Sequence, residues 1–323
     1  MGIRVIVTGA AGFVGSHLVD LLLKNRCEEV IGIDNLRTGN MNNLSLASDY
    51  ENFRFLEADI RDIRNVDPEL FDGFDAIFHL AANADIRGGI DDTAIDFNLN
   101  VMATLDVCRF AVEAGIPNIL FASTGSVYGD PIVFPTPEGL ASEANQTSMY
   151  SASKLSAEAM LSAFHYSFGL NVAKCRMSSI LGTRYAHGHV WDFTSSLLRN
   201  PDYLKVLGNG QQLKSYLNVA DCVSAFWLLF NCMRDGIVSH EVFNLAHHDA
   251  VTVLQSLHWI CEEHDVNPRI DVGDEPRGWI GDNPRIELDI EKLKGLGWSP
   301  KISLETSIKQ TARDIRERIE RPE

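Results

Sequence analysis

The chain has 323 residues, of which 45% are hydrophobic and 22% charged, values that are ordinary for a globular protein with room for two lobes. Its formal net charge of −16 argues against a nucleic-acid-binding protein, which would carry a basic stripe. Six cysteines are scattered without a Cys-x-x-Cys pair, and the sequence has neither a signal peptide nor a long apolar run. We therefore expect an unprocessed cytoplasmic enzyme with reduced thiols and no membrane segment.

Strands alternate with helices through the first half of the chain. Buried strands are predicted at residues 3–8, 30–33, 53–56, 76–79, 118–122 and 171–175, and helices at 16–23, roughly 91–114 and around Tyr150. This alternation is typical of parallel βαβ units, so we predict an α/β fold with a Rossmann-type doubly wound parallel sheet.

After about Arg176 the loops lengthen and the regular alternation of strands and helices ends. Helices are predicted near residues 190–199, 219–234, 252–263 and 303–318. We expect residues 1–176 to form the nucleotide-binding domain and residues 177–323 to form a smaller C-terminal α/β substrate-binding lobe. The lobe is expected to be discontinuous, with residues 211–235 returning to the first domain.

Gly9, Gly12 and Gly15 separate the first predicted strand from the first helix. Glycines at this spacing permit a tight turn and a close approach of the backbone to a pyrophosphate at the helix N-terminus. Asp34 ends the next strand, where a carboxylate accepts hydrogen bonds from the adenosine ribose and repels a 2′-phosphate. We therefore predict NAD rather than NADP, a preference that Arg37 weakens; the alternative is a structural turn followed by a chance acid.

Asp59 and Ile60 follow the third predicted strand, where an adenine could lie against the backbone. The Asp59 carboxylate could accept from the adenine amino group. It could equally cap a helix over residues 60–66, and the sequence leaves both interpretations open.

The fifth predicted strand runs into a hydroxyl-rich segment at residues 123–129. Ligands of such sheets bind beyond the carboxyl ends of the strands, so a hydroxyl of this segment could hold a substrate oxygen. Tyr150 and Lys154 lie four residues apart and would share one face of a helix. We expect the lysine to lower the pKa of Tyr150 from about 10 towards neutrality, which makes a general base for an alcohol. The alternatives are a packed tyrosine beside a solvated lysine, and a Ser/Thr-rich turn.

Motifs along nearly the whole chain resemble the extended short-chain dehydrogenase/reductase superfamily, in its nucleotide-sugar epimerase/dehydratase branch of the UDP-glucose 4-epimerase type. In chain order they are Thr8-Gly-x-x-Gly-x-x-Gly15, Asp34-Asn-Leu, Asp59-Ile, His79-Leu-Ala-Ala82, Asn100-Val-x-Ala-Thr104, Ser123-Thr-x-x-Val-Tyr-Gly129, Tyr150-x-x-x-Lys154, Gly210-x-Gln-x-Lys-Ser-Tyr216 with Asp221, and Leu296-Gly-Trp-x-Pro300.

The resemblance implies NAD as cofactor and a nucleotide-diphosphate sugar as substrate, with a UDP-sugar favoured. Tyr150 would remove the proton of a sugar hydroxyl, usually at C4, while the hydride passes to NAD⁺. Lys154 would hold the nicotinamide ribose, and Thr124 would bond the sugar oxygen. Besides Tyr150 and Lys154, the implied cofactor-binding residues are Gly9, Gly12, Phe13, Val14, Gly15, Asp34, Asn35, Leu36, Thr38, Gly39, Asp59, Ile60, Leu80, Ala81, Ala82 and Asn100.

The reaction that follows the 4-keto stage depends on local acids. Relatives that act as 4,6-dehydratases carry Asp-Glu after the threonine, and decarboxylases carry Glu before Val-Tyr-Gly, whereas this chain has Gly125 and Ser126. We therefore expect a 4-epimerase, which needs only oxidation, rotation of the keto sugar and hydride return. A 4-ketoreductase, a dehydratase with acids elsewhere and a non-catalytic NAD-binding protein remain alternatives.

The substrate lobe departs from the family pattern at two positions. Ser179 stands where relatives carry asparagine, and Lys214 stands where they carry a phosphate-binding arginine. Lysine keeps the positive charge but lacks the bidentate fork. Arg277 is assigned to the diphosphate; its alternative is a loop arginine paired with Asp274 or Glu275.

The remaining residues predicted to bind substrate lie in loops. Arg87 could meet a substrate carboxylate or be a solvated arginine. His187 and His189 lack supporting ligands, so we predict no metal and place them in the substrate cleft or at the cap of the helix that starts near Val190. The expected substrate-binding residues are Arg87, Thr124, Ser126, Ser179, His189, Val190, Lys214 and Arg277. The resemblance also implies a homodimer through helices near 91–114 and 147–168.

Overall fold

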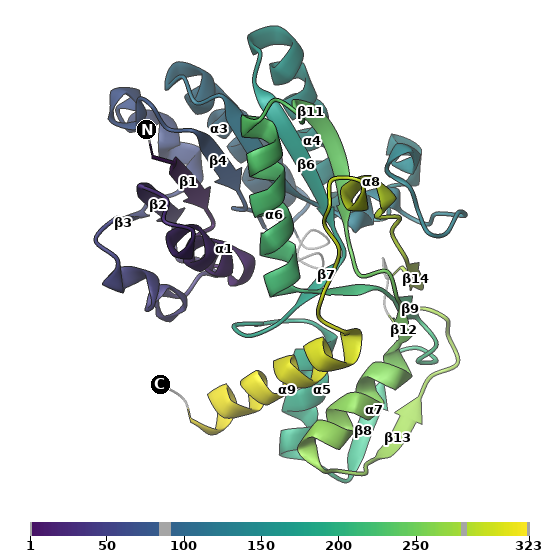
Figure 1. Ribbon diagram of the computed structural model, residues 1–323. Coiled ribbons are helices and arrows are strands. Elements are labelled where there is room, and N and C mark those ends of the chain that lie inside the picture. Colours follow the sequence, from purple (N-terminus) through teal and green to yellow (C-terminus); the bar gives the residue numbers. More distant parts are fainter. Residues whose placement is uncertain (1, 84–91, 279–282, 322–323) are drawn as a thin grey trace. The chain divides into compact units, whose positions relative to one another are not determined.

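The computed structural model describes residues 2–83, 92–278 and 283–321 (Figure 1). The chain divides into two compact units, each made of three segments. Unit 1 comprises Met1–Gly129, Ala141–Met177 and Val223–Phe243, and unit 2 comprises Asp130–Leu140, Ser178–Cys222 and Asn244–Glu323. The assignment of nucleotide binding to one unit and of substrate binding to the other stays a prediction.

A seven-stranded sheet has the order β11-β6-β5-β4-β1-β2-β3. Its strands are β1 (Arg4–Thr8), β2 (Glu29–Asp34), β3 (Phe53–Glu57), β4 (Ala76–His79), β5 (Asn118–Thr124), β6 (Asn171–Met177) and β11 (His240–Leu245). All pairings from β3 through β6 are parallel. The order reverses between β1 and β4, which confirms the doubly wound Rossmann-type sheet and puts its switch point beside the glycine loop. Sequence reasoning found six of these strands and missed β11.

Helices cover both faces of this sheet (Figure 1). Ile77 of β4 faces a core with residues of α3 (Ala103–Glu113) and α4 (Met149–Phe168). The next residue, Phe78, faces the other way and packs on Phe230 of α6 (Val219–Arg234), with ring centroids 5.5 Å apart. The helix α1 (Phe13–Lys24) packs against β1 and β2. Burial on both faces explains why the strands read as continuous apolar runs.

The helix predicted over 91–114 is not one regular helix. It contains a π-helical segment, η5 (Phe97–Met102), followed by α3, and residue 91 lies outside the described residues. Short 3-10 turns fill the connections: η1 (Met41–Leu44), η2 (Ala47–Asp49), η3 (Ile60–Asn65), η4 (Pro68–Phe71), η6 (Gly125–Tyr128), η7 (Glu138–Leu140) and η8 (Glu143–Asn145).

The start of α4 is fixed by a reciprocal capping box. The Ser148 hydroxyl accepts from the Ser151 amide at 3.1 Å, and the Ser151 hydroxyl accepts from the Ser148 amide at 3.3 Å. The helix ends at Gly169, whose left-handed φ of 76° suits glycine. The box places Tyr150 in the first turn of the helix and Lys154 one turn later, as the sequence predicts.

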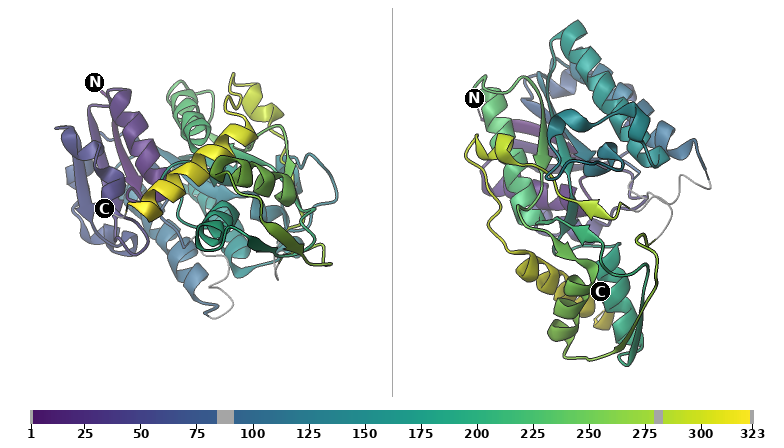
Figure 2. Two further views of the ribbon diagram at one scale, coloured as in Figure 1. Left: turned by 90° about the horizontal axis from the view of Figure 1, so that it is seen from below. Right: turned by 90° about the vertical axis from the view of Figure 1, so that its right-hand side faces the viewer.

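Unit 2 combines three helices with short strand pairs. The helices α5 (His189–Arg199), α7 (Val253–His264) and α9 (Leu304–Glu320) pack on one another (Figure 2). The strands pair as β7 (Ser179–Leu181) with β10 (Tyr216–Asn218), β8 (Tyr203–Val206) with β13 (Arg269–Val272), and β9 (Leu213–Lys214) with both β12 (Val251–Thr252) and β14 (Arg285–Ile286). A single turn, α8 (Glu291–Lys294), follows. Among the described helices, none is both long and apolar enough to cross a bilayer.

We expect Gly9→Ala to destabilise the protein far more than Gly115→Ala. Both glycines have a left-handed φ, 71° and 67°, so both substitutions carry the same backbone penalty. A Cβ on Gly9 would also lie 2.8 Å from the Ala81 nitrogen, whereas nothing lies within 4 Å of a Cβ on Gly115. Urea denaturation should show an additional loss of roughly 2 kcal/mol or more for Gly9→Ala, in the range of other strained or overpacked sites. Equal losses would contradict the close packing of the β1 and β4 ends.

Candidate active site

The backbone of the glycine loop packs tightly against β2 and against the first turn of α1. The Gly9 amide donates to the Ile33 carbonyl at 2.8 Å, and a Cβ on Gly15 would lie 2.0 Å from the Gly9 carbonyl oxygen. Gly12 caps α1, whose first turn contains no acidic residue. The loop therefore ends at the N-terminus of α1, a position that attracts anions. This arrangement fits the pyrophosphate of a dinucleotide.

Asp34 is held rigidly at the end of β2. Its carboxylate accepts from the Ala11 amide at 3.1 Å and from the Leu36 amide at 2.8 Å. Burial raises the pKa of Asp34, while these backbone donors lower it. A Cβ on Gly39 would lie 2.8 Å from the carboxylate, so this glycine keeps the adjoining chain close. The geometry fits a fixed acceptor for ribose hydroxyls.

Asp59 caps η3, the second of the two interpretations that the sequence left open. Its carboxylate accepts from the Arg61 amide at 3.0 Å, from the Arg61 guanidinium and from the Asn35 amide group. The hydrogen bond with Arg61 holds the pKa of Asp59 well below its usual range. Ile60 is almost completely buried. An adenine contact at Asp59 stays a prediction.

A buried histidine, His79, fixes the segment Leu80–Ala82; the sequence placed His79 in a motif with this segment but did not predict its structural role. His79 Nδ1 lies 2.8 Å from the Thr8 hydroxyl, and its Nε2 lies 3.1 Å from the Thr104 hydroxyl. The same Thr8 oxygen accepts from the Ala81 amide at 3.1 Å. Burial lowers the pKa of His79 to about 3, so the ring is neutral. This chain of hydrogen bonds ties the ends of β1 and β4 to α3; a histidine inside an apolar strand was the available signal.

The side chain of Asn100 forms hydrogen bonds with other residues of the protein. Its side-chain oxygen accepts from the Asn83 amide at 2.8 Å, and its nitrogen donates to the Ser153 hydroxyl of α4 at 2.9 Å. Asn83 also donates to Asp96, a carboxylate that is only 1% exposed. Sequence reasoning missed Asp96, since an acid in a helical stretch is usually solvated. The proposed contact of Asn100 with the cofactor stays a prediction.

The structure brings Thr124, Tyr150 and Lys154 together in unit 1. Thr124, at the end of β5, donates to the Ser126 hydroxyl at 3.2 Å and makes a hydrogen bond with Tyr150. Lys154 is 2% exposed; its ammonium donates to the Ala122 carbonyl at 2.9 Å and lies 4.7 Å from the centre of the Phe121 ring. A phenol, a hydroxyl and a buried cation thus meet at the carboxyl edge of the sheet.

The expectation that Lys154 lowers the pKa of Tyr150 towards neutrality is wrong for this arrangement. Burial raises the pKa of Tyr150 to about 12, the hydrogen bond with Thr124 lowers it, and the negative charge of Asp96 raises it further. The Lys154 ammonium bonds a backbone carbonyl instead of the phenol. Burial lowers the pKa of Lys154 itself to about 8, opposed by the negative charges of Glu158 and Asp96.

Three of the predicted substrate residues gather in unit 2 around Tyr216. Ser179 is exposed and pairs in register with Tyr216, on whose ring His189 stacks with centroids 4.7 Å apart. Burial lowers the pKa of His189 to about 3, and the positive charge of Lys214 contributes. The Lys214 ammonium donates to the Asn283 carbonyl.

The other predicted substrate residues differ in their surroundings. Arg277 forms an exposed ion pair with Asp130 at 2.9 Å, a partner that the sequence did not indicate. The Val190 side chain is completely buried, which leaves only its backbone for a ligand. The Ser126 hydroxyl is engaged by Thr124, and Arg87 lies outside the described residues.

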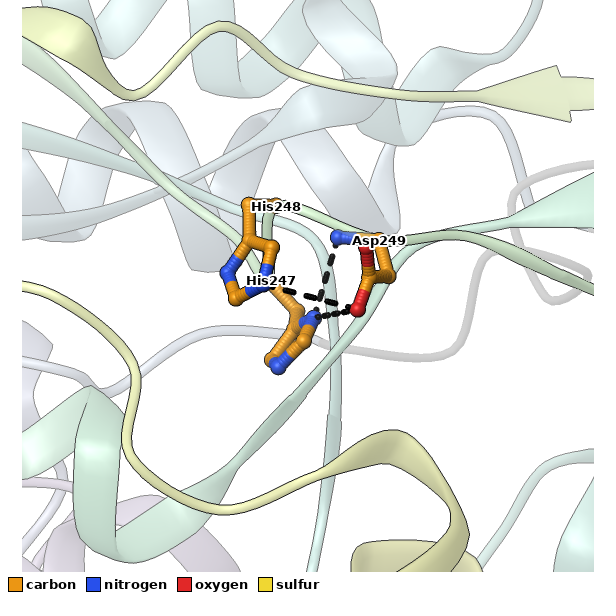
Figure 3. Close-up of side chains that lie close together, drawn as sticks. All are labelled: His247, His248 and Asp249. Carbon is orange, nitrogen blue, oxygen red and sulfur yellow. Dashed lines mark hydrogen bonds and ion pairs between the residues drawn. The ribbon is translucent and has the colours of Figure 1, made fainter.

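One group within the described ranges places three possible metal ligands close together. Ligand atoms of His247, His248 and Asp249, in the loop after β11, lie within 4.8 Å of one another (Figure 3). However, His247 Nδ1 accepts from the Asp249 amide at 3.0 Å, and the two imidazoles stack with centroids 4.2 Å apart. Because His247 Nδ1 already accepts a hydrogen bond from a backbone amide, we assign no metal to the cluster.

A doubly wound sheet that presents a glycine loop before α1, an acid after β2 and a tyrosine–lysine pair beyond β5 defines a dinucleotide-dependent enzyme of the short-chain dehydrogenase/reductase type. A sequence model of the NAD dependent epimerase/dehydratase family matches residues 5–246. The chain belongs to this family, and NAD is its cofactor, as the glycine loop and Asp34 predict.

The relatives of this chain include more than one activity. It is 31% identical to a UDP-glucose 4-epimerase of Mycolicibacterium smegmatis over 328 residues, covering 97% of this chain and 98% of the relative. It is 32% identical to UDP-glucuronic acid decarboxylase 2 of Arabidopsis thaliana over 325 residues, covering 98% and 69%. Among solved structures, a UDP-glucose 4-epimerase of Thermotoga maritima with UDP-glucose superimposes with a TM-score of 0.86 at 31% identity, covering 98% of this chain and 100% of that one.

Asp34→Asn should weaken NAD binding and reduce the preference over NADP. The amide keeps the size of the side chain but loses the charge that favours ribose hydroxyls and repels a 2′-phosphate. Hydrogen bonds to charged groups are worth roughly 1.5–3 kcal/mol, so titration calorimetry should show a roughly 10- to 100-fold weaker NAD affinity. Asp62→Asn, at an exposed position of η3, is the matched control and should change neither affinity. Unchanged NAD binding by Asp34→Asn would remove Asp34 from the site.

Proposed function

We propose that this chain is an NAD-dependent nucleotide-sugar 4-epimerase. The observation that carries the proposal is the segment after Thr124, where Gly125 and Ser126 provide no carboxylate and the Ser126 hydroxyl is bonded to Thr124. A dehydratase or decarboxylase of the family type needs an acid or base at these positions. An epimerase needs only a base, a hydride acceptor and room for the keto sugar to rotate.

In the proposed reaction Tyr150 takes the proton of the C4 hydroxyl, and Thr124 hydrogen-bonds the same oxygen. NAD, which the glycine loop and Asp34 would hold, would supply the hydride acceptor for the oxidation at C4 and the hydride donor for the return to the opposite face. The high pKa of Tyr150 means that its phenolate must be stabilised by nearby positive charge. We infer that Lys154, one turn later on α4, would supply this charge once it turns from the Ala122 carbonyl towards the bound ligands, and it would also hold the nicotinamide ribose. The reverse proton transfer from Tyr150 completes the epimer.

A UDP-sugar is the proposed substrate. The names of the epimerase relative and of the superimposed structure with UDP-glucose support it. Lys214 and Arg277 are the proposed diphosphate ligands, and Ser179 and His189 the proposed sugar or nucleotide contacts. Arg87 remains a proposed contact for a substrate carboxylate. A cytoplasmic location is also proposed, supported by six cysteines that are all buried thiols.

The purified protein should carry NAD and interconvert C4 epimers of a UDP-sugar without added cofactor. Tyr150→Phe removes the general base and should lower kcat by about 10²- to 10⁴-fold while NAD stays bound. Product analysis by NMR, with NAD measured on the same samples, checks both points. Tyr166→Phe, on the same helix but 79% exposed, is the control and should keep full activity. Near-full turnover by Tyr150→Phe would exclude this mechanism.

A second candidate, a dehydratase or decarboxylase on the same scaffold, is favoured by one observation. Asp96 is a buried carboxylate whose charge acts on Tyr150, so an acid does exist near the proposed base. Loss of water or of carbon dioxide in the product mass would select this candidate. Steady consumption of reduced cofactor would instead indicate a 4-ketoreductase.

A homodimer is also proposed. The helical segments η5, α3 and α4 pack side by side and expose large apolar side chains, among them Phe97 on η5 and Tyr166 on α4. Exposed apolar residues concentrated on packed helices are typical of an interaction surface.

The double substitution Phe97→Glu/Tyr166→Glu should convert the dimer to a monomer, because it places charges in an apolar interface. Light scattering of the unmodified protein should give twice the 35.9 kDa chain mass, and the variant should give the single mass. Ile132→Glu, at a position 95% exposed in unit 2, should leave the mass unchanged. A monomeric unmodified protein would refute the proposal.

A further inference from the structure

A buried ion pair begins on α4, one turn after the proposed catalytic residue Lys154. Glu158 follows Lys154 by one turn of α4 and pairs with Arg176 of β6 through two hydrogen bonds, of 2.9 and 2.6 Å. Both side chains are only 5% exposed. The Ser123 hydroxyl of β5 donates to the same carboxylate at 2.5 Å, and Arg176 donates to the Tyr128 hydroxyl at 3.1 Å.

Stability alone does not account for such a pair. The desolvation of two buried charges can exceed their attraction, and well-packed apolar side chains of similar volume often stabilise a fold at least as well. The informative property of this pair is the set of elements that it joins. Ser123 precedes Thr124 at the end of β5, Tyr128 closes η6, and Glu158 shares α4 with Tyr150 and Lys154.

The charge of Glu158 also reaches Lys154. Burial disfavours the ammonium form of Lys154, and the carboxylate of Glu158 is the largest influence that opposes this effect, followed by Asp96. His79 on β4 also interacts electrostatically with Lys154, and it is neutral because burial lowers its pKa to about 3. Among the described residues, Glu158 and Asp96 are therefore the anions that compensate the buried cation.

We propose that Glu158 is a positioning residue of the Thr124–Tyr150–Lys154 centre, acting in two ways: through Ser123 it fixes the end of β5 that carries Thr124, and from the next turn of α4 its buried carboxylate compensates the charge of the Lys154 ammonium. Arg176 orients the carboxylate for both tasks. The role in turnover rests on the proposed function, whereas the effect on Lys154 is a property of the protein itself.

The direction of the effect follows from the charges. A lysine beside a carboxylate holds its proton to higher pH, so removal of the carboxylate lets Lys154 lose its proton at lower pH. In the proposed reaction the Tyr150 phenolate needs a positive charge nearby, and Lys154 would provide it only while it keeps its proton. The upper break in the pH profile of kcat/KM, at which activity stops rising with pH, should therefore move down when Glu158 is neutralised.

The test replaces the whole pair, because neutralising Glu158 alone would leave Arg176 buried and uncompensated. In Glu158→Gln/Arg176→Met, protein labelled with ¹³Cε-lysine is titrated by NMR, with Lys154→Arg used to assign the resonance. We expect the pKa of Lys154 to fall by roughly one unit or more, and the upper break of kcat/KM to fall with it, while thermal stability is retained. The exposed pair Glu263–Arg313, replaced as Glu263→Gln/Arg313→Met, is the control and should change neither quantity.

A folded double variant in which Lys154 titrates as before would overturn the proposal. If that variant does not fold, Glu158→Asp tests the proposal instead. This substitution keeps the negative charge but withdraws the carboxylate from Ser123. It should lower kcat with unchanged KM and an unchanged pKa of Lys154, and an unchanged kcat would refute the positioning role. A shifted Lys154 titration in a protein that epimerises no sugar would refute the proposed function alone.

Discussion

The buried ammonium group of Lys154 is the constraint on which the site depends. A cation that is 2% exposed is stable only where hydrogen bonds and opposite charge replace water. The Ala122 carbonyl and the Phe121 ring of β5 lie against it, and two carboxylates, Glu158 and Asp96, oppose the loss of its proton. These groups come from β5, α4 and the chain just before η5, so the cation is accommodated only when the three segments take their observed places. The same places bring Thr124 to Tyr150.

The parallel direction of the strands positions the other predicted site residues of unit 1. Because β1, β2 and β5 run in one direction, the glycine loop, Asp34 and Thr124 all follow carboxyl ends at the same edge of the sheet. The close approach of Gly9 to Ala81 and the neutral His79 between Thr8 and Thr104 then fix this edge without adding charge to it.

The sequence predicted the features that depend on interactions between residues close together in the chain. The cap at Ser148, the alternating strands and helices of unit 1 and the glycine loop are all visible in short windows of sequence. Two-residue strands such as β9, β12 and β14 carry no such pattern, and they form only because tertiary packing pairs them. The pKa of Tyr150 was mispredicted because burial, which dominates it, cannot be read from spacing. A lysine and a glutamate at i and i+4, such as Lys154 and Glu158, usually form a surface pair, and only the buried Arg176 opposite Glu158 indicates another role.

Overall identity does not separate the reactions of this family, since an epimerase and a decarboxylase match this chain at 31% and 32%. The discrimination must come from a few positions that touch the 4-keto sugar after the shared oxidation. A group that protonates or deprotonates C5 has to lie within hydrogen-bond reach of that carbon. The 3-10 turn η6 follows Thr124 directly, yet its first two residues, Gly125 and Ser126, offer no titratable group. We therefore propose that this chain, which keeps the oxidation centre and has no acid at the start of η6, epimerises its substrate by rotation of the keto sugar and return of the hydride.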